Sequence, residues 1–107
     1  MDMIVLEEKA VPDPTLFVEK RDGRRVIFDV DKIDKALHKA AEKVMDVTPL
    51  VEKRLSTLVE RIVEEIHSRF PQGVKIYEIQ NIVEHELLEA KEYALAEEYI
   101  TYRTQRD

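Results

Sequence analysis

Two short apolar runs near the start of the chain predict a β-hairpin over residues 15–28. Leu16-Phe17-Val18 and Val26-Ile27-Phe28 are both rich in β-prone side chains, and Asp22-Gly23 lies between them. Because glycine adopts a positive φ without a steric penalty, an Asp-Gly pair between two apolar runs is a strong hairpin signal.

Apolar residues at helical spacing predict four helices after the hairpin. The first begins near Asp29 or Asp31, either of which can cap free N–H groups, and the second begins at Thr48-Pro49 and ends at Phe70. The third and fourth are separated by a soft break between Ala90 and Glu92, where the apolar stripe changes phase. The four stripes run over residues 33–44, 51–66, 79–87 and 95–103.

The remaining segments complete an α+β domain. Val74-Lys75-Ile76 is short and β-branched, so it predicts a third, brief strand or an extended link. Residues 1–14 form a predicted N-terminal extension that is loosely held or pairs at a sheet edge, because the two prolines of Val11-Pro12-Asp13-Pro14 interrupt regular structure. Residues 15–107 then follow the order β-β-α-α-β-α-α, which predicts an antiparallel helix bundle with a small sheet on one side.

Composition narrows the function classes. The 107 residues suffice for one compact domain, and 44% hydrophobic with 37% charged residues argue against disorder and against a membrane span. Cysteine is absent, which excludes disulfides, thiolate metal sites, iron–sulfur clusters and catalytic thiols from this sequence. We expect His38, His67 and His85 to be exposed on helices. With two glycines and no nucleophile or acid–base pair, the chain does not resemble an enzyme.

Net charge directs attention to a local basic patch. The chain carries −6 at pH 7, so as a whole it repels nucleic acid and anionic lipid. The hairpin tip nevertheless carries four cations, Lys20, Arg21, Arg24 and Arg25. This cluster predicts a site that binds polyphosphate. Strand alternation places Val18 and Lys20 on one face and Glu19 and Arg21 on the other. The alternative interpretation is a charged turn that keeps edge strands soluble.

Two helical features add weaker candidates for an anion site. The first helix presents free N–H groups at its start, and Lys32 lies in its first turn, on a polar face that also carries Lys35, Lys39 and Lys43. On the last helix, aromatic and cationic side chains lie one turn apart, and together they could hold a base and a phosphate. These residues are Tyr99, Tyr102, Arg103 and Arg106. An ordinary solvated lysine, and core tyrosines followed by C-terminal charges, are the alternatives.

These motifs together resemble the ATP-cone family found at the N-terminus of ribonucleotide reductases. The resemblance covers residues 16–106, and the C-terminal segment is most similar to cones of the anaerobic class. It rests on Val18-Glu19-Lys20-Arg21-Asp22-Gly23, on Val26, Phe28 and Asp31-Lys32-Ile33, on Gly73-Val74 with Glu78-Ile79, and on the segment from Tyr99 to Arg106.

The resemblance implies a four-helix bundle capped by a three-stranded sheet, and a function. Such a domain binds ATP or dATP as an allosteric effector and controls ribonucleotide reductase, and hence deoxyribonucleotide synthesis, through oligomeric state. We expect Mg²⁺ with the nucleotide, Asp22 and Asp31 as the nearest carboxylates, a reductase or another cone as partner, and a cytoplasmic location. The implied nucleotide-binding residues are Val18, Lys20, Arg21, Gly23, Val26, Phe28, Asp31, Lys32, Ile33, Arg103 and Arg106.

The resemblance also implies roles for single residues, and this sequence departs from the family pattern at two positions. Lys20 and Arg21 match phosphate- and base-proximal positions, Lys32 a phosphate contact, and Val18 the adenine pocket. Ile76 stands where many cones carry a threonine.

Gln105 lies near a common lysine position, and Arg103 or Arg106 are candidates to replace that lysine. The effector preference and the number of nucleotides therefore stay open. Without cysteine, the chain is predicted to be an isolated regulatory domain, cut from a ribonucleoside-diphosphate or -triphosphate reductase or standing alone. The alternative is a degenerate cone that acts as a ligand-free helical protein-interaction module.

Overall fold

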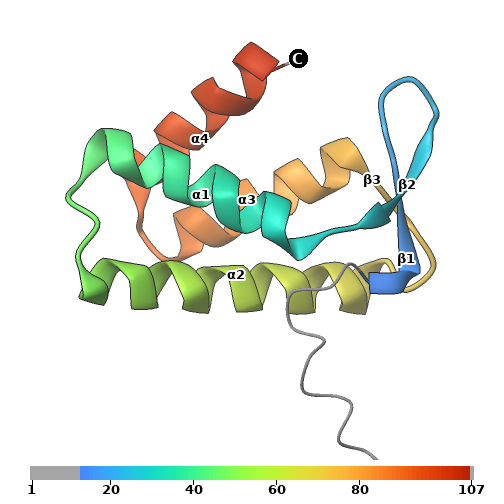
Figure 1. Cartoon of the computed structure of the whole chain (residues 1–107), viewed down its shortest axis with the longest axis horizontal. Helices are drawn as coiled ribbons and strands as arrows, with labels where there is room; N and C mark the ends of the chain where they lie inside the picture. The colour runs from blue at the N-terminus through green and yellow to red at the C-terminus, as the bar shows by residue number, and fades with distance from the viewer. Residues whose placement is uncertain (1–12, 107) are drawn as a thin grey trace, which may run out of the picture.

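The computed structural model describes residues 13–106, and side chains from Leu16 to Thr104. These residues form four helices and a three-stranded sheet, which confirms the predicted α+β class (Figure 1). In chain order the elements are β1 (Asp13–Glu19), β2 (Arg25–Phe28), α1 (Val30–Val44), α2 (Pro49–Arg69), β3 (Val74–Lys75), α3 (Ile76–Glu89) and α4 (Tyr93–Arg106).

The sheet is mixed and has the strand order β2-β1-β3. The central strand β1 pairs antiparallel with β2, where Val18 lies opposite Val26, and parallel with β3, where Val18 lies opposite Val74. Leu16 and Val18 are buried, whereas Phe17 between them is exposed. One face of the sheet therefore closes the helical core, as its alternation requires.

Strand β1 begins earlier than predicted, because Asp13 and Pro14 belong to it. Of the two predicted alternatives for this segment, pairing with the sheet holds at Asp13, which lies opposite Phe28. The β1–β2 register shifts between Asp13 and Phe17, so regular pairing is interrupted around Pro14, as its missing N–H donor allows. The rest of the predicted N-terminal extension, residues 1–12, lies outside the described part of the chain.

The predicted hairpin is confirmed, and its loop is built around Gly23. The Gly23 amide donates to the Lys20 carbonyl at 2.9 Å, and the Lys20 amide donates to the Arg24 carbonyl at 2.8 Å. Gly23 has φ +89°, a conformation that side-chain-bearing residues rarely adopt. Asp22 Oδ1 accepts from the Arg24 amide at 3.0 Å and its Oδ2 from Arg24 Nε at 2.8 Å, which fixes the tip.

Side-chain caps set the predicted helix starts. Asp29 accepts a hydrogen bond from the Asp31 amide at the start of α1, and Thr48 accepts one from the Val51 amide at the start of α2. The third helix starts at Ile76, one residue inside the predicted third strand.

The reason for this early start is a bond at the beginning of α3. Glu78 Oε1 accepts from the Lys75 amide at 2.9 Å, so the helix is capped there and β3 keeps two residues. The predicted break between α3 and α4 is confirmed. Lys91 has φ +61° in that break, and the Glu92 amide donates back to the Leu87 carbonyl at 2.9 Å.

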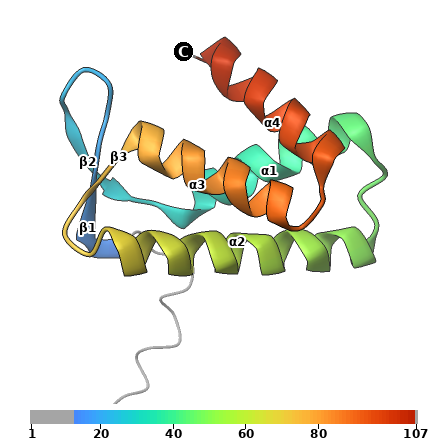
Figure 2. The same cartoon turned by 180° about the vertical axis from the view of Figure 1, so that it is seen from behind.

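The helices enclose one apolar core. Helix α1 packs against α2 and α4, and α3 packs against the same two helices. Leu37, Ile62, Ile66 and Leu87 have no exposed surface. Viewed from either side, α2 runs along one edge, and the hairpin tip and the C-terminal end of α4 both rise away from it (Figures 1 and 2). None of the described helices is long and apolar enough to span a membrane.

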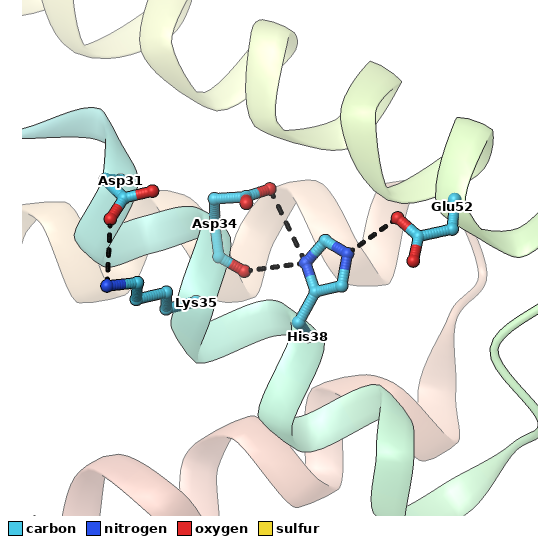
Figure 3. Close-up of polar contacts among 5 residues, drawn as sticks. All are labelled: Asp31, Asp34, Lys35, His38 and Glu52. Atoms are coloured by element: carbon cyan, nitrogen blue, oxygen red, sulfur yellow. Dashed lines mark hydrogen bonds and ion pairs between the residues drawn. The ribbon is translucent and has the colours of Figure 1, made fainter. Parts of the chain in front are cut away.

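The histidines differ from the prediction that all three are exposed. His85 is exposed, but His38 and His67 are half-buried, because each lies where its helix meets another element. His38 Nε2 lies 2.9 Å from Glu52 Oε1 of α2, and its Nδ1 lies 3.0 Å from the Asp34 carbonyl oxygen (Figure 3). The His67 ring meets the Phe28 ring edge to face, with 5.8 Å between centroids.

Candidate functional site

A cleft of about 610 Å³ lies between the hairpin tip, α1, α3 and α4, and we call it the basic cleft. In Figure 1 the hairpin tip and the outer half of α4 stand on the same side of the molecule, with α1 and α3 between them. The lining residues are Lys20, Arg21, Asp22, Arg24, Lys32, Lys35, Ala36, Lys39, Ile76, Gln80, Tyr99, Tyr102 and Arg103.

The hairpin tip supplies one wall. Strand β1 ends at Glu19, so strand alternation does not apply beyond it, and Lys20 and Arg21 both line the cleft instead of facing opposite sides. Arg21 Nη2 donates to Gln80 Oε1 of α3 at 3.3 Å. This bond ties the hairpin tip to the helix across the cleft.

Helix α1 supplies a second, lysine-rich wall. Lys32, Lys35 and Lys39 lie three and four positions apart, which places them on one helical face. Ala36 lies within the same face and is half-buried, so its small side chain leaves room for a ligand. Lys35 Nζ forms an exposed ion pair with Asp31 at 3.1 Å, which turns that carboxylate toward the lysine row (Figure 3).

Helices α3 and α4 supply a third wall with apolar and aromatic surface. Ile76 and Tyr102 are half-buried, and Tyr99 is buried with 6% exposure. Arg103 Nε donates to Glu84 of α3, and both side chains of this pair are mostly buried. The pair holds the end of α4 against α3 and fixes Arg103 at the edge of the cleft.

The basic cleft carries a strong positive charge in an acidic chain. Seven of its lining residues are cations and only Asp22 is a carboxylate. Within the described part of the chain, Lys20, Lys32 and Lys39 form no ion pair. The backbone and side-chain hydrogen bonds from Arg24 lower the pKa of Asp22, so that carboxylate stays ionised. The site is therefore built for an anion with several charges.

The structure brings four of the predicted nucleotide-binding residues together. Lys20, Arg21, Lys32 and Arg103 all line the basic cleft. Of the other seven, the six with described side chains do not line it. Three are core residues (Val18, Phe28 and Ile33), Val26 is half-buried against the core, Gly23 shapes the loop, Asp31 pairs with Lys35, and the Arg106 side chain lies outside the described residues.

Local geometry explains these placements. Val18 and Phe28 lie on the face of the sheet that covers the helices, and Ile33 lies on the inward face of α1. Gln80 was not identified from the sequence, because a single glutamine on an otherwise ordinary helix gives no signal. Lys35 and Lys39 do give a signal in the sequence, because they lie at helical spacing from Lys32 in a chain of net negative charge.

The residues of the basic cleft do not fit a protein-bound Mg²⁺ ion. Magnesium takes oxygen ligands, which proteins usually supply as one or two carboxylates. Both oxygens of Asp22 already accept from Arg24, and Asp31 pairs with Lys35 and does not line the cleft. Among the described residues, no three histidines or carboxylates gather where they could hold a metal ion.

Comparison with known proteins identifies the family. Residues 16–107 match the ATP cone domain. The chain is 37% identical, over 86% of its length, to the ribonucleoside-diphosphate reductase subunit alpha of Chlamydia muridarum, and 34% identical, over 84%, to the anaerobic ribonucleoside-triphosphate reductase of Haemophilus influenzae. It is 35% identical, over 89%, to the transcriptional repressor NrdR of Carboxydothermus hydrogenoformans.

These relatives differ greatly in length. The chain spans 10% of the Chlamydia reductase subunit, 12% of the Haemophilus enzyme and 59% of the Carboxydothermus repressor. What the relatives share with this chain is therefore one domain. Since the family match covers almost all of the described residues, and the predicted fold is present, the chain belongs to the ATP cone domain family.

Proposed function

We propose that this domain is a non-enzymatic regulatory element that binds ATP and dATP in the basic cleft. The observation that carries the proposal is the composition of the cleft walls. Cations from the hairpin and α1 face an apolar and aromatic wall from α3 and α4. A nucleoside triphosphate has the same two parts, a charged phosphate chain and a flat base.

In this proposal the phosphates lie between the hairpin tip and α1. Arg21 offers a planar, bidentate donor pair, whereas Lys20 and Lys32 act as point charges on either side. Lys35 and Lys39 continue the positive surface along α1. Two segments, the hairpin tip and α1, thereby act on one polyanion, and this arrangement favours a triphosphate over a single phosphate.

The base lies against the third wall. Ile76 of this wall and Ala36 of the opposing α1 wall offer apolar contacts, and the Tyr102 ring offers a surface for stacking. The Gln80 carboxamide is the neutral amide among the lining residues, and it can exchange its bond with Arg21 for a bond with the ligand. Val18, Phe28 and Ile33 support the hairpin and α1 from the core, so their role is positioning.

We further propose that nucleotide binding controls a ribonucleoside-diphosphate or -triphosphate reductase through its oligomeric state. The family match and the similarity to two reductases support the link to a reductase. ATP and dATP differ by one ribose hydroxyl, so a direct hydrogen bond to it supplies about 0.5–1.5 kcal/mol of difference. A nucleotide shifts an equilibrium only through unequal affinity for two states, and the remainder of the protein must supply those states.

Calorimetric titration with ATP and dATP tests the binding site. The double variant Lys20→Ala/Arg21→Ala removes two cations from the cleft, and we expect it to lose measurable binding. Lys53→Ala/Arg61→Ala is the matched control, since it removes the same charge from exposed positions of α2 outside the cleft. Equal loss in both variants would indicate a diffuse charge effect. No binding by the folded parent chain would favour the ligand-free interaction module.

Light scattering tests the oligomeric proposal separately. The protein with saturating ATP and the protein with saturating dATP are expected to differ in mass. The same mass with both nucleotides, under conditions where calorimetry shows that both bind, would reject control through oligomeric state and leave the binding site intact.

A further inference from the structure

Three carboxylates near the cations of the basic cleft are already engaged. Asp22 accepts from Arg24 through both oxygens, Asp31 pairs with Lys35 at 3.1 Å, and Glu84 accepts from Arg103. Each of these bonds satisfies a carboxylate with a cation of the cleft itself. A divalent ion bound with the ligand would compete with one of those cations for each of these three carboxylates.

The cations of the basic cleft outnumber the carboxylates that pair with them. Seven lining cations are opposed by these three carboxylates, so about four positive charges remain for a ligand. A metal-free nucleoside triphosphate carries about four negative charges near pH 7, because its terminal phosphate bears about two. Magnesium neutralises two of them and coordinates the same oxygens that lysine and arginine would bind.

We propose that the basic cleft takes the nucleoside triphosphate without its Mg²⁺, so that Mg²⁺ competes with the cleft for the phosphates. The inference rests on the proposed function, since it specifies the form of the nucleotide that the same site binds. Lys20, Lys32 and Lys39 form no ion pair with the described residues, so no described carboxylate competes with the phosphate oxygens for them. Removing half of the ligand's charge weakens each of these contacts.

This competition makes nucleotide binding by the domain depend on the concentration of free Mg²⁺. At a fixed total nucleotide concentration, the occupied fraction of the cleft rises as free Mg²⁺ falls. The domain therefore responds to the ratio of nucleotide to Mg²⁺ as well as to the amount of nucleotide, without needing a metal site of its own.

Calorimetry with ATP at constant pH and ionic strength tests the inference in two arms, one with EDTA and one with excess Mg²⁺. We expect the dissociation constant to be about tenfold lower in EDTA, a difference of about 1.4 kcal/mol. Equal or tighter binding in Mg²⁺ would overturn the inference while leaving the proposed function intact. Absence of binding in both arms would instead overturn the proposed function.

Two variants separate charge balance from direct metal coordination. Lys39→Gln removes one charge from the cleft and is expected to reduce the preference for metal-free ATP. Lys43→Gln, one turn further along α1 and outside the cleft, is expected to retain it. Asp22→Asn preserves the preference if no metal is bound there; weaker binding of this variant in the Mg²⁺ arm alone would show that Asp22 is a ligand and would contradict the inference.

Discussion

Arg21 and Gln80, which are 59 positions apart in the sequence, meet across the basic cleft in a hydrogen bond of 3.3 Å. The arginine belongs to the hairpin loop and the glutamine to α3. Because the loop projects from the sheet, this bond is a tie between its tip and the helical part of the domain (Figure 2). The position of the hairpin wall thus depends on a residue in a different wall.

Replacing Gln80 with methionine is expected to weaken ATP binding about threefold to tenfold. The methionine preserves the length of the side chain but removes the acceptor for Arg21, and an exposed hydrogen bond contributes about 0.5–1.5 kcal/mol. Titration calorimetry measures the effect. Gln72→Met, at an exposed position that does not line the basic cleft, is the control. An unchanged affinity in Gln80→Met would show that the tie does not position Arg21 for the ligand.

Stability is expected to fall as pH rises through the range in which His38 loses its proton. The hydrogen bond to Glu52 and then the contact with the Asp34 carbonyl raise the pKa of His38, while partial burial opposes them (Figure 3). A raised folded-state pKa adds stability that is fully present below the unfolded value of about 6.5 and is lost above the folded one. Urea unfolding at about pH 5.5 and about pH 9 measures the difference.

The variant His38→Gln is expected to flatten this pH dependence, because it removes the titrating group that joins α1 to α2. His85→Gln is the matched control on an exposed helical position, with a side chain that is 63% exposed. If His38→Gln and the parent chain show the same pH dependence of unfolding free energy, the His38–Glu52 contact does not contribute to it.

Gly23→Ala is expected to destabilise the domain by about 1–2 kcal/mol, because alanine is strained at φ +89°. No atom of the described residues lies within 4 Å of the added methyl group, so the expected cost comes from the backbone. Thermal unfolding is expected to shift by about 4–8 °C for each kcal/mol. Gly73→Ala is the control, since its methyl group would lie at an ordinary 3.7 Å from the Phe17 carbonyl oxygen. Equal effects of the two variants would contradict this explanation.

Ile62→Ala is expected to cost about 2–5 kcal/mol, because Ile62 is fully buried between helices and its truncation leaves a cavity. Leu50→Ala, at a position that is 70% exposed, is expected to change the free energy of unfolding by less than about 0.5 kcal/mol. Chemical denaturation measures both values. A small effect of Ile62→Ala would mean that α2 contributes less to the core than its burial indicates.

Features governed by neighbouring residues could be predicted from the sequence. Thr48 and Asp29 cap the helices that they precede, and Gly23 permits the positive φ of its loop, because each interaction involves atoms a few residues apart. The start of α3 was missed by one residue. The hydrogen bond from the Lys75 amide to Glu78 caps the helix there, whereas strand pairing would extend β3. The sequence does not show which of these two structures forms at Ile76.

Features governed by tertiary packing could be predicted only in part. Lys20, Arg21, Lys32 and Arg103 were identified by type and by family resemblance, and the structure places all four on one cleft. Their distances from Gln80 and from the lysine row of α1 follow from how α1, α3 and α4 pack, which no local pattern encodes. The half-burial of His38 likewise depends on Glu52 reaching it from another helix.

The parallel pairing of Val18 with Val74 has a consequence for the order of folding. The chain segment between these two residues contains all of α1 and α2. Closing such a long loop costs conformational entropy, so β1 and β3 pair only after both helices have been synthesised and packed. During synthesis the hairpin and α1 emerge first, and one side of β1 stays without a neighbour until β3 arrives. A nascent chain that stalls before Val74 therefore exposes an unpaired strand edge, which is the kind of surface on which chains aggregate.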